Sequence, residues 1–452
     1  MRIIIAGGGK IGRSVAAILS EEGHDITVLD RDSELIGQIS NDLDVICVEG
    51  SATNPETLRE AGAASADLLM AATEKDEVNM VCGISARKLG TKHVIARVRD
   101  PEYLRQTEFL REALGLSVIV NPEYECAKEI SRVLRFPSAV RVDAFSKGSA
   151  EIVEHRVAPG GKLDGVQLKL LAREMGAKVL VSVVEREGEA LIPNGDFVLR
   201  ALDRLSITGS ANELRRFFIN CGTYHKPVRR VLLVGGSRIA VYLSRILLDS
   251  GMSVTVVEKD RARCERLCDL IPKAQIVCGD ATRSDVLLED GLASADAFVA
   301  LTGEDGDNII TSMYARTLGV GKIVAKVNRE HFSDILENAG LDSIVTPKDL
   351  VAQQLARYVR AMNNSLGSRM ETLYRLADGQ IEAMEFIIAP GSALVGTPLR
   401  SLRLKPNILI GSVIRGTHSI LPDGNTVIQP GDHAVIVARA GLISDADDIV
   451  EG

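Results

Sequence analysis

The sequence predicts an α/β protein in which two parallel-sheet domains alternate with two small α+β domains. Short aliphatic runs alternate with stretches of helical periodicity, a pattern typical of parallel βαβ units. The pattern occurs a second time, with matching residues 228 or 229 positions further along the 452-residue chain. Aromatic residues make up only 4% and Trp is absent, so we expect aliphatic cores, as buried parallel sheets have.

The first unit alternates strands and helices from its start. Residues 2–6 are an apolar run bounded by glycines, which predicts a buried strand, and residues 11–21 have helical periodicity that ends at Gly23. We expect further strands at residues 25–30, 44–48, 67–72, 93–98 and 117–120, with helices between them. Right-handed crossovers then place these strands in one parallel sheet.

A smaller, strand-rich module is expected after each parallel-sheet unit. In the first module, alternating patterns at residues 178–184 and 203–208 indicate strands, and one helix is expected near residues 165–175. The chain is therefore predicted to contain four domains. These are residues 1–139 and 223–367 for the parallel-sheet units, and residues 140–222 and 368–452 for the α+β modules.

The repeat is also visible in short motifs. The loop at residues 7–12 returns at residues 235–240, Gly50-Ser51-Ala52-Thr53 returns as Gly279-Asp280-Ala281-Thr282, and Asn79 returns as Asn308. The modules repeat as well, since Val157-Ala158-Pro159-Gly160 matches Ile388-Ala389-Pro390-Gly391. We interpret the chain as the duplication of a two-domain unit.

The first glycine loop has the features of a Rossmann dinucleotide-binding site. Gly7 permits a tight turn after the strand, Gly9 lets a pyrophosphate approach the backbone, and Gly12 lets the helix pack on the strand. The helix N-terminus supplies unpaired N–H groups to the phosphates. Asp30 ends the second strand, where its carboxylate accepts hydrogen bonds from ribose hydroxyls and favours NAD over NADP. The predicted loop residues are Gly7, Gly8, Gly9, Lys10, Ile11 and Gly12.

Four more candidates lie at the C-terminal ends of later strands of the first unit, at the edge where open α/β sheets bind ligands. Ser51 is expected near the adenine, and Thr73 and Glu74 near the nicotinamide. Arg97 is a charge inside an apolar strand, which is costly unless an anion pairs with it. A structural salt bridge and a ligand phosphate both explain Arg97.

The second glycine loop departs from the full pattern. Gly235 keeps the turn glycine, but Ser237 replaces the glycine of closest approach. Glu258 still supplies a ribose carboxylate, Asp280 replaces Ser51, and Thr302 corresponds to Thr73. This site is predicted to bind a dinucleotide weakly, to bind another adenine nucleotide, or to be vestigial.

Composition and charge argue against several functional classes for this chain. A net charge of −8 argues against a nucleic-acid partner, and we expect no secretion signal and no membrane span. Seven cysteines without a C-x-x-C pair fit a reducing compartment, and Cys264 and Cys268 are interpreted as ordinary residues of one helix face. No His, Lys or Tyr constellation suggests catalysis, so we expect neither catalytic residues nor a metal site.

The chain resembles the TrkA proteins, which are duplicated forms of the RCK (or KTN) regulators of K⁺ conductance. The resemblance covers nearly the whole length and rests on the first glycine loop, Asp30, the two Gly-x-Ala-Thr turns, Asn121-Pro122, Thr346-Pro347 and both modules. It implies a peripheral subunit on the cytoplasmic face of the membrane. Such a subunit binds NAD(H), with ATP or ADP as alternatives, and acts on a TrkH- or KtrB-like K⁺-translocating partner.

Duplicated units favour ring-like assembly, so we expect a homo-oligomer, a dimer or a tetramer. Two other functions stay open at this point. One is an NAD-dependent oxidoreductase, and the other is an RCK-like regulator of another transporter.

Overall fold

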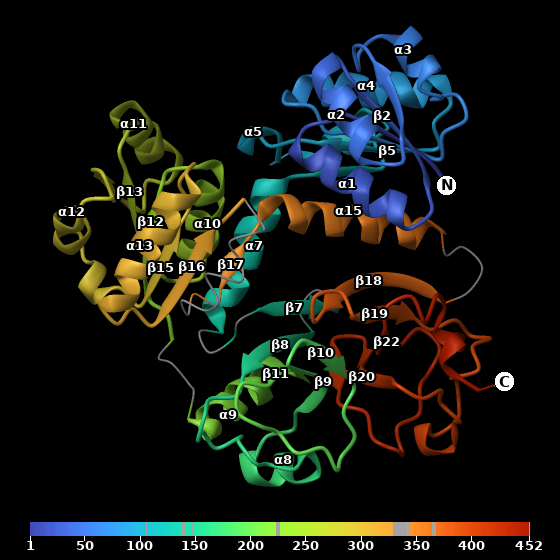
Figure 1. The fold of residues 1–452 in the computed structure, drawn as a ribbon, viewed down its shortest axis with the longest axis vertical. Helices are drawn as coiled ribbons and strands as arrows, with labels where there is room; N and C mark the ends of the chain where they lie inside the picture. Colours follow the sequence, from blue (N-terminus) through green and yellow to red (C-terminus); the bar gives the residue numbers. More distant parts are fainter. Residues whose placement is uncertain are drawn as a thin grey trace.

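Four sheets follow one another along the chain in the computed structural model (Figure 1). The structure describes residues 1–104, 106–136, 139, 141–146, 149–222, 227–328, 341, 343–363 and 368–451. Two sheets of six parallel strands alternate with two antiparallel sheets of five strands, which confirms the predicted fold class. Within these residues, no helix combines the length and the apolar character that crossing a bilayer requires.

The first parallel sheet has the strand order β3-β2-β1-β4-β5-β6. The order reverses between β1 and β4, and open α/β sheets bind ligands at such a point. Its strands are β1 (Arg2–Ala6), β2 (Asp25–Asp30), β3 (Ile46–Glu49), β4 (Leu68–Ala71), β5 (His93–Arg97) and β6 (Val118–Val120). Its helices are α1 (Lys10–Glu21), α2 (Ser33–Asp42), α3 (Pro55–Glu60), α4 (Asp76–Leu89), α5 (Pro101–Leu104), α6 (Thr107–Ala113) and α7 (Pro122–Arg135).

The second parallel sheet repeats this order as β14-β13-β12-β15-β16-β17. Its strands are β12 (Arg230–Val234), β13 (Ser253–Glu258), β14 (Gln275–Cys278), β15 (Ala297–Ala300), β16 (Lys322–Lys326) and β17 (Ile344–Val345). Its helices are α10 (Arg238–Asp249), α11 (Arg261–Leu270), α12 (Ser284–Glu289), η2 (Leu292–Ser294), α13 (Asp305–Thr317) and α15 (Pro347–Asn363).

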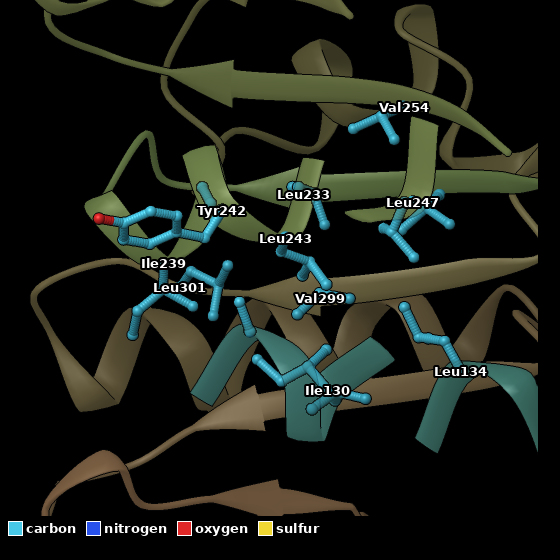
Figure 2. Packing of buried hydrophobic residues seen from close by; sticks show 14 of the residues in the cluster. Ile130, Leu134, Leu233, Ile239, Tyr242, Leu243, Leu247, Val254, Val299 and Leu301 are labelled. Carbon is cyan, nitrogen blue, oxygen red and sulfur yellow. The ribbon is translucent and has the colours of Figure 1, made fainter. Parts of the chain in front are cut away.

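The last helix of each parallel-sheet unit packs on the other unit. Helix α7 follows β6, but Ile130 and Leu134 belong to one buried cluster with Leu243 of α10 and Val299 of β15 (Figure 2). Reciprocally, α15 lies along α1 (Figure 1), and Leu355 is buried in the core of the first unit. Each unit therefore completes the hydrophobic core of the other, and the two units cannot separate without exposing apolar surface.

The first antiparallel module follows α7 and has the strand order β10-β9-β11-β8-β7. Its elements are β7 (Val142–Phe145), β8 (Ala150–Arg156), α8 (Leu168–Met175), β9 (Leu180–Arg186), β10 (Glu189–Leu191), β11 (Arg204–Gly209) and α9 (Ala211–Cys221). The helix expected near residues 165–175 is α8. Helix α9 was not expected, although Ser210 caps it by accepting a hydrogen bond from the Glu213 N–H and Gly222 ends it in the left-handed conformation.

The second antiparallel module has the order β18-β19-β22-β20-β21. Its elements are β18 (Arg369–Leu376), β19 (Ile381–Ile387), η4 (Leu399–Ser401), β20 (Ile408–Arg415), β21 (His418–Ile420), β22 (His433–Arg439) and η5 (Ala446–Ile449). The two modules share a buried cluster that contains Phe145 and Val183 of the first and Ile381 and Val437 of the second. The two modules therefore form one layered body beneath the parallel-sheet units (Figure 1).

A polar network lies at the border between the two modules. The Glu385 carboxylate is almost fully buried and accepts a hydrogen bond from the Ser146 backbone N–H at 3.2 Å. The His433 Nδ1 lies 2.7 Å from Glu385 Oε1, and one Glu371 oxygen lies 3.9 Å from the same nitrogen. Among the described residues, this is the group whose donor atoms are close enough together to hold a metal ion. Partners from both modules satisfy the buried carboxylate.

Candidate nucleotide-binding sites

Of the four glycines in the first loop, the three of the G-x-G-x-x-G pattern are explained by different features of the structure. Gly7 has φ +112°, and a Cβ there would lie 2.8 Å from the Ala72 backbone. A Cβ on Gly12 would lie 1.9 Å from the Gly7 carbonyl oxygen. A Cβ on Gly9 would meet no atom within 4 Å. The chain itself therefore requires Gly7 and Gly12, whereas Gly9 leaves open space at the start of α1.

Asp30 joins the end of β2 to the glycine loop. Its Oδ2 accepts a hydrogen bond from the Gly8 N–H at 2.7 Å, and its Oδ1 accepts one from the Asp32 N–H at 3.1 Å. The carboxylate is thereby held next to the N-terminus of α1, and it is only partly buried. This is the position from which a carboxylate can reach a ribose while the loop holds the phosphates.

The second loop has the same arrangement. Gly235 has φ +93°, and the Gly236 N–H donates to Glu258 Oε2 at 2.7 Å. Glu258 Oε1 accepts from the Asp260 N–H at 2.9 Å, and the Arg263 guanidinium lies 3.5 Å from Oε2. Glu258 is more deeply buried than Asp30, with 5% of its surface exposed.

Ser237 and Gly9 precede equivalent helices, but only Ser237 caps the N-terminus of its helix with a side chain. The Ser237 hydroxyl accepts a hydrogen bond from the Ala240 N–H at 3.4 Å and so caps α10. Gly9 cannot cap α1 with a side chain. One of the N–H groups that the N-terminus of α10 could offer to a phosphate, that of Ala240, is therefore already hydrogen-bonded in the second unit.

A cavity of about 280 Å³ surrounds the second loop. It is just below the usual size range of small-molecule sites, about 300–1,000 Å³. Basic groups from Lys259 and Arg263 line it together with acidic groups from Glu304 and Asp307. The structure brings all five residues predicted for this site into the lining, namely Gly235, Ser237, Glu258, Asp280 and Thr302.

Ser51 and Asp280 stabilise equivalent turns. The Ser51 hydroxyl lies 3.0 Å from the Thr53 hydroxyl, and Asp280 Oδ1 accepts from the N–H and hydroxyl of Thr282 at 2.9 and 2.8 Å. These hydrogen bonds hold the pKa of Asp280 below its usual value. The second site therefore has a carboxylate where the first has a neutral hydroxyl.

Asn79 is a site residue that the sequence interpretation missed. Its Oδ1 accepts from the Thr73 N–H at 2.8 Å, and its Nδ2 donates to the Arg97 carbonyl at 2.8 Å. It is fully buried and ties the loop after β4 to β5. Asn308 makes the equivalent bonds to Thr302 and to Lys326 of β16. The recurrence of Asn79 as Asn308 was the available signal.

Arg97 has few partners for a partly buried charge. Its guanidinium reaches the Ala72 carbonyl at 3.4 Å, and its Nε has no hydrogen-bond partner. Burial lowers the pKa of Arg97, and the positive charge of Arg99 lowers it further. No carboxylate in the described part of the chain lies within 4.0 Å of it. The sequence left two interpretations of Arg97 open, a structural salt bridge and a ligand phosphate. The described residues contain no such salt bridge.

Lys10 faces the second unit across a cleft of about 950 Å³. Lys10 and Arg13 of α1 line one side, and Asp305, Asn328 and Lys348 of the second unit line the other. Ile11 follows on α1 and is partly buried, whereas Glu74 is exposed on the loop after β4. The first glycine loop therefore lies beside the border between the two parallel-sheet units.

Models of two protein domains match the chain, each of them twice. The TrkA-N domain matches residues 3–122 and 231–347, and the TrkA-C domain matches residues 152–220 and 383–450. The alternating order of the matches agrees with the predicted duplication.

Known proteins are similar over nearly the full length. A Trk system potassium uptake protein TrkA homolog from Archaeoglobus fulgidus is 33% identical, over 99% of this chain and all of that protein. The structure of the GsuK channel bound to NAD is 19% identical, with a TM-score of 0.63, and covers 99% of this chain and 77% of that one. GsuK bound to ADP is 18% identical, with a TM-score of 0.50, and covers 79% of this chain and 69% of that one. These two solved structures share the fold of this chain, and the domain matches together with the full-length similarity show that the chain belongs to the TrkA family.

Proposed function

We propose that the chain is a nucleotide-sensing regulatory subunit of a Trk- or Ktr-type potassium uptake system. In this proposal, NAD(H) or an adenine nucleotide such as ATP or ADP binds at the glycine loops, and binding gates a membrane K⁺-translocating subunit. One observation carries the proposal. Each glycine loop is held by a carboxylate at the end of the second strand, in two units that share their cores through exchanged helices.

The first site is proposed to bind the full dinucleotide. Gly9 leaves space for the pyrophosphate, Asp30 binds the ribose, and Ser51 lies toward the adenine. Thr73 and Glu74 are assigned to the nicotinamide side. Arg97 is assigned to a ligand phosphate, because its partly buried charge has no carboxylate partner among the described residues.

The exchanged helices provide a route from nucleotide binding to the second unit. Asn121 caps α7 in the first unit, and its Nδ2 donates to the Tyr242 hydroxyl of α10 at 3.0 Å. The same hydroxyl donates to the Arg99 carbonyl, just after β5, at 2.8 Å. A nucleotide that binds one arrangement of these contacts better than another favours that arrangement by its differential affinity.

The remaining features of the proposal concern the whole protein. The chain is proposed to act from the cytoplasmic face of the membrane, on a TrkH- or KtrB-like partner, as a homo-oligomer. We propose domain borders at residues 139/140, 222/223 and 367/368. We propose that it is a regulator and not an enzyme, since the names of its relatives describe potassium uptake.

Potassium uptake is the direct test. Cells that lack their own TrkA-type protein but keep the K⁺-translocating partner should recover K⁺ uptake with the wild-type chain, and not with Asp30→Ala. Uptake that is the same with and without the chain rules out the proposal. The oxidoreductase alternative is tested by following NADH absorbance with the purified protein across a substrate panel, where turnover would support an enzyme.

A further inference from the structure

Three of the seven cysteines lie in the second parallel-sheet unit, and two of them, Cys264 and Cys278, are neighbours of Glu258. Cys264 and Cys268 are on α11, and Cys278 is the last residue of β14. Cys264 is 6% exposed, and its thiol donates to the backbone carbonyl of Glu258 at 3.2 Å. Cys268 and Cys278 are exposed.

The strand register brings Cys278 to the same place. Glu258 of β13 and Cys278 of β14 are direct partners in the parallel pairing. Ile276 packs in the cluster that contains Leu267 of α11, so this face of β14 lies against α11. Side chains alternate along a strand, so Cys278 points to the same face as Ile276. The Cys264 and Cys278 thiols therefore converge beside Glu258.

The pKa of Cys264 agrees with this geometry. Burial raises the pKa of Cys264 to about 11, and the neighbouring Cys278 thiol contributes to the increase. A buried thiol with a raised pKa reacts slowly by itself, whereas an exposed thiol is open to reagents. The pair thus consists of an accessible cysteine and a protected one in contact with it.

We propose that Cys264 and Cys278 form a reversible disulfide at the edge of the second nucleotide pocket. The oxidant is a low-molecular-weight disulfide, RS–SR. The Cys278 thiolate attacks one sulfur, forms a mixed disulfide and releases RS⁻. Cys264 then loses its proton and attacks the Cys278 sulfur, which releases the second RS⁻. The two cysteine protons are taken up by the released thiolates, so the dithiol is oxidised while RS–SR is reduced to two RSH.

The disulfide changes the surroundings of the second site. The Glu258 carbonyl loses its thiol donor, and the end of β14 is tied to α11. The next residues, Gly279 and Asp280, line the pocket. This consequence rests on the proposed nucleotide binding, whereas the disulfide itself does not. We expect the affinity of the second site for ADP to fall roughly tenfold on oxidation, as for the loss of one good hydrogen bond.

The duplication supplies an internal control. Cys264 and Cys278 correspond to Ile36 and Glu49 in the first unit. Glu49 is the pairing partner of Asp30, as Cys278 is of Glu258. The equivalent place in the first unit therefore holds no thiol pair, and oxidation should leave the first site unchanged.

Peptide mapping tests the disulfide directly. The full chain is treated with hydroxyethyl disulfide or with dithiothreitol, alkylated after denaturation and digested with trypsin. Cleavage follows Arg263, Arg266, Lys273 and Arg283, so each of the three cysteines falls in its own peptide. We expect peptide 264–266 joined to peptide 274–283 after oxidation, and its loss with dithiothreitol. Peptide 267–273 joined to 274–283 instead, or no joined peptide, overturns the proposal.

Variants separate the disulfide from its consequence. Cys268→Ser should still give the joined peptide, and Cys278→Ser should not. ADP titration in the Gly9→Val background then reports on the second site in reduced and oxidised protein. Equal ADP affinities in the two forms overturn the proposed effect on binding. If neither the wild-type nor the Gly9→Val protein binds a nucleotide in its reduced form while the joined peptide forms, the proposed function fails and the disulfide stands.

Discussion

At the scale of single residues, Gly9 and Ser237 are the difference between the two glycine loops that bears most directly on ligand binding. Both begin the helix after the glycine loop, but only Ser237 caps its helix. A substituent on Gly9 would meet no protein atom within 4 Å. The glycine at position 9 is therefore not a requirement of the free fold, and space for a ligand explains it.

The first prediction concerns these two residues. Gly9→Val should fold normally and lose NAD binding at the first site, because the side chain fills the space for the pyrophosphate. Ser237→Gly should strengthen binding at the second site, since it frees the Ala240 N–H at a cost of a few tenths of a kcal/mol in capping. Calorimetric titration of NAD into wild type and both variants is the measurement. Two equal sites in the wild type would contradict this account.

The second prediction concerns Asp30. Asp30→Ala removes the acceptor for the ribose hydroxyls, and each such charge-assisted bond contributes about 1.5–3 kcal/mol. NAD affinity at the first site should fall tenfold or more. Asp30→Asn keeps an acceptor for the Gly8 N–H and should lose less. Glu258→Ala serves as the matched change in the second unit. Unchanged NAD affinity in a folded Asp30→Ala protein would refute the site.

Sequence patterns predicted the site residues whose type is required by local sterics or chemistry. They missed the residues whose role depends on contacts with parts of the chain that are distant in sequence. Gly7, Gly12 and Asp30 could be predicted because a turn, a close approach and a strand end each demand a residue type. That no carboxylate of the described residues pairs with Arg97 could not be predicted, since it depends on where distant carboxylates lie in the fold. Asn79 was missed because a buried amide gains its role only when β4 and β5 lie side by side.

At the scale of elements, the exchange of α7 and α15 is the main feature that periodicity could not predict. The apolar spacing of residues 122–135 indicates a helix with one buried face, but not which sheet that face covers. The strands of the first parallel sheet were predicted to within about two residues, because glycines and charged residues bound them. Helix α9 carried capping signals at Ser210 and Gly222 and could have been predicted.

The third prediction tests the exchange. Ile130→Ala changes a residue of the first unit, but it leaves a cavity in the core of the second (Figure 2). We expect a loss of about 2–5 kcal/mol in the free energy of unfolding. Amide hydrogen exchange should then speed up in β12 and α10, and less in β1. Ile219→Ala, at a half-exposed position of α9, is the control and should change stability by less than about 0.5 kcal/mol. Faster exchange confined to β1 would contradict the packing.

At the scale of the whole molecule, both halves expose apolar side chains at equivalent positions. Val81 and Ile84 on α4 correspond to Ile310 and Met313 on α13, and all four are at least 36% exposed. Equivalent faces on duplicated units suit contacts between copies of the same chain.

The fourth prediction uses these faces. Val81→Asp with Ile310→Asp should shift the purified protein toward the monomer, because a buried unpaired charge at each contact costs several kcal/mol. Light scattering after size exclusion gives the mass. Lys88→Asp, on the same helix α4 but next to its end, is the charge-changing control. A wild-type protein that is already monomeric, or an oligomer unaffected by the double change, would exclude these faces as the contact.

The last prediction concerns the membrane. No helix among the described residues is fit to cross a bilayer, yet relatives are named for potassium uptake. Association should therefore depend on a protein partner, and the chain should pellet with membranes only when a K⁺-translocating subunit is present. Binding through lipid charge alone is disfavoured, because the net charge is −8 and anionic lipids attract basic segments. Membranes from cells with and without the translocating subunit are compared by sedimentation and immunoblotting, with salt washes to remove loosely bound protein. Equal amounts in the two pellets would show that the partner is not what holds the chain at the membrane.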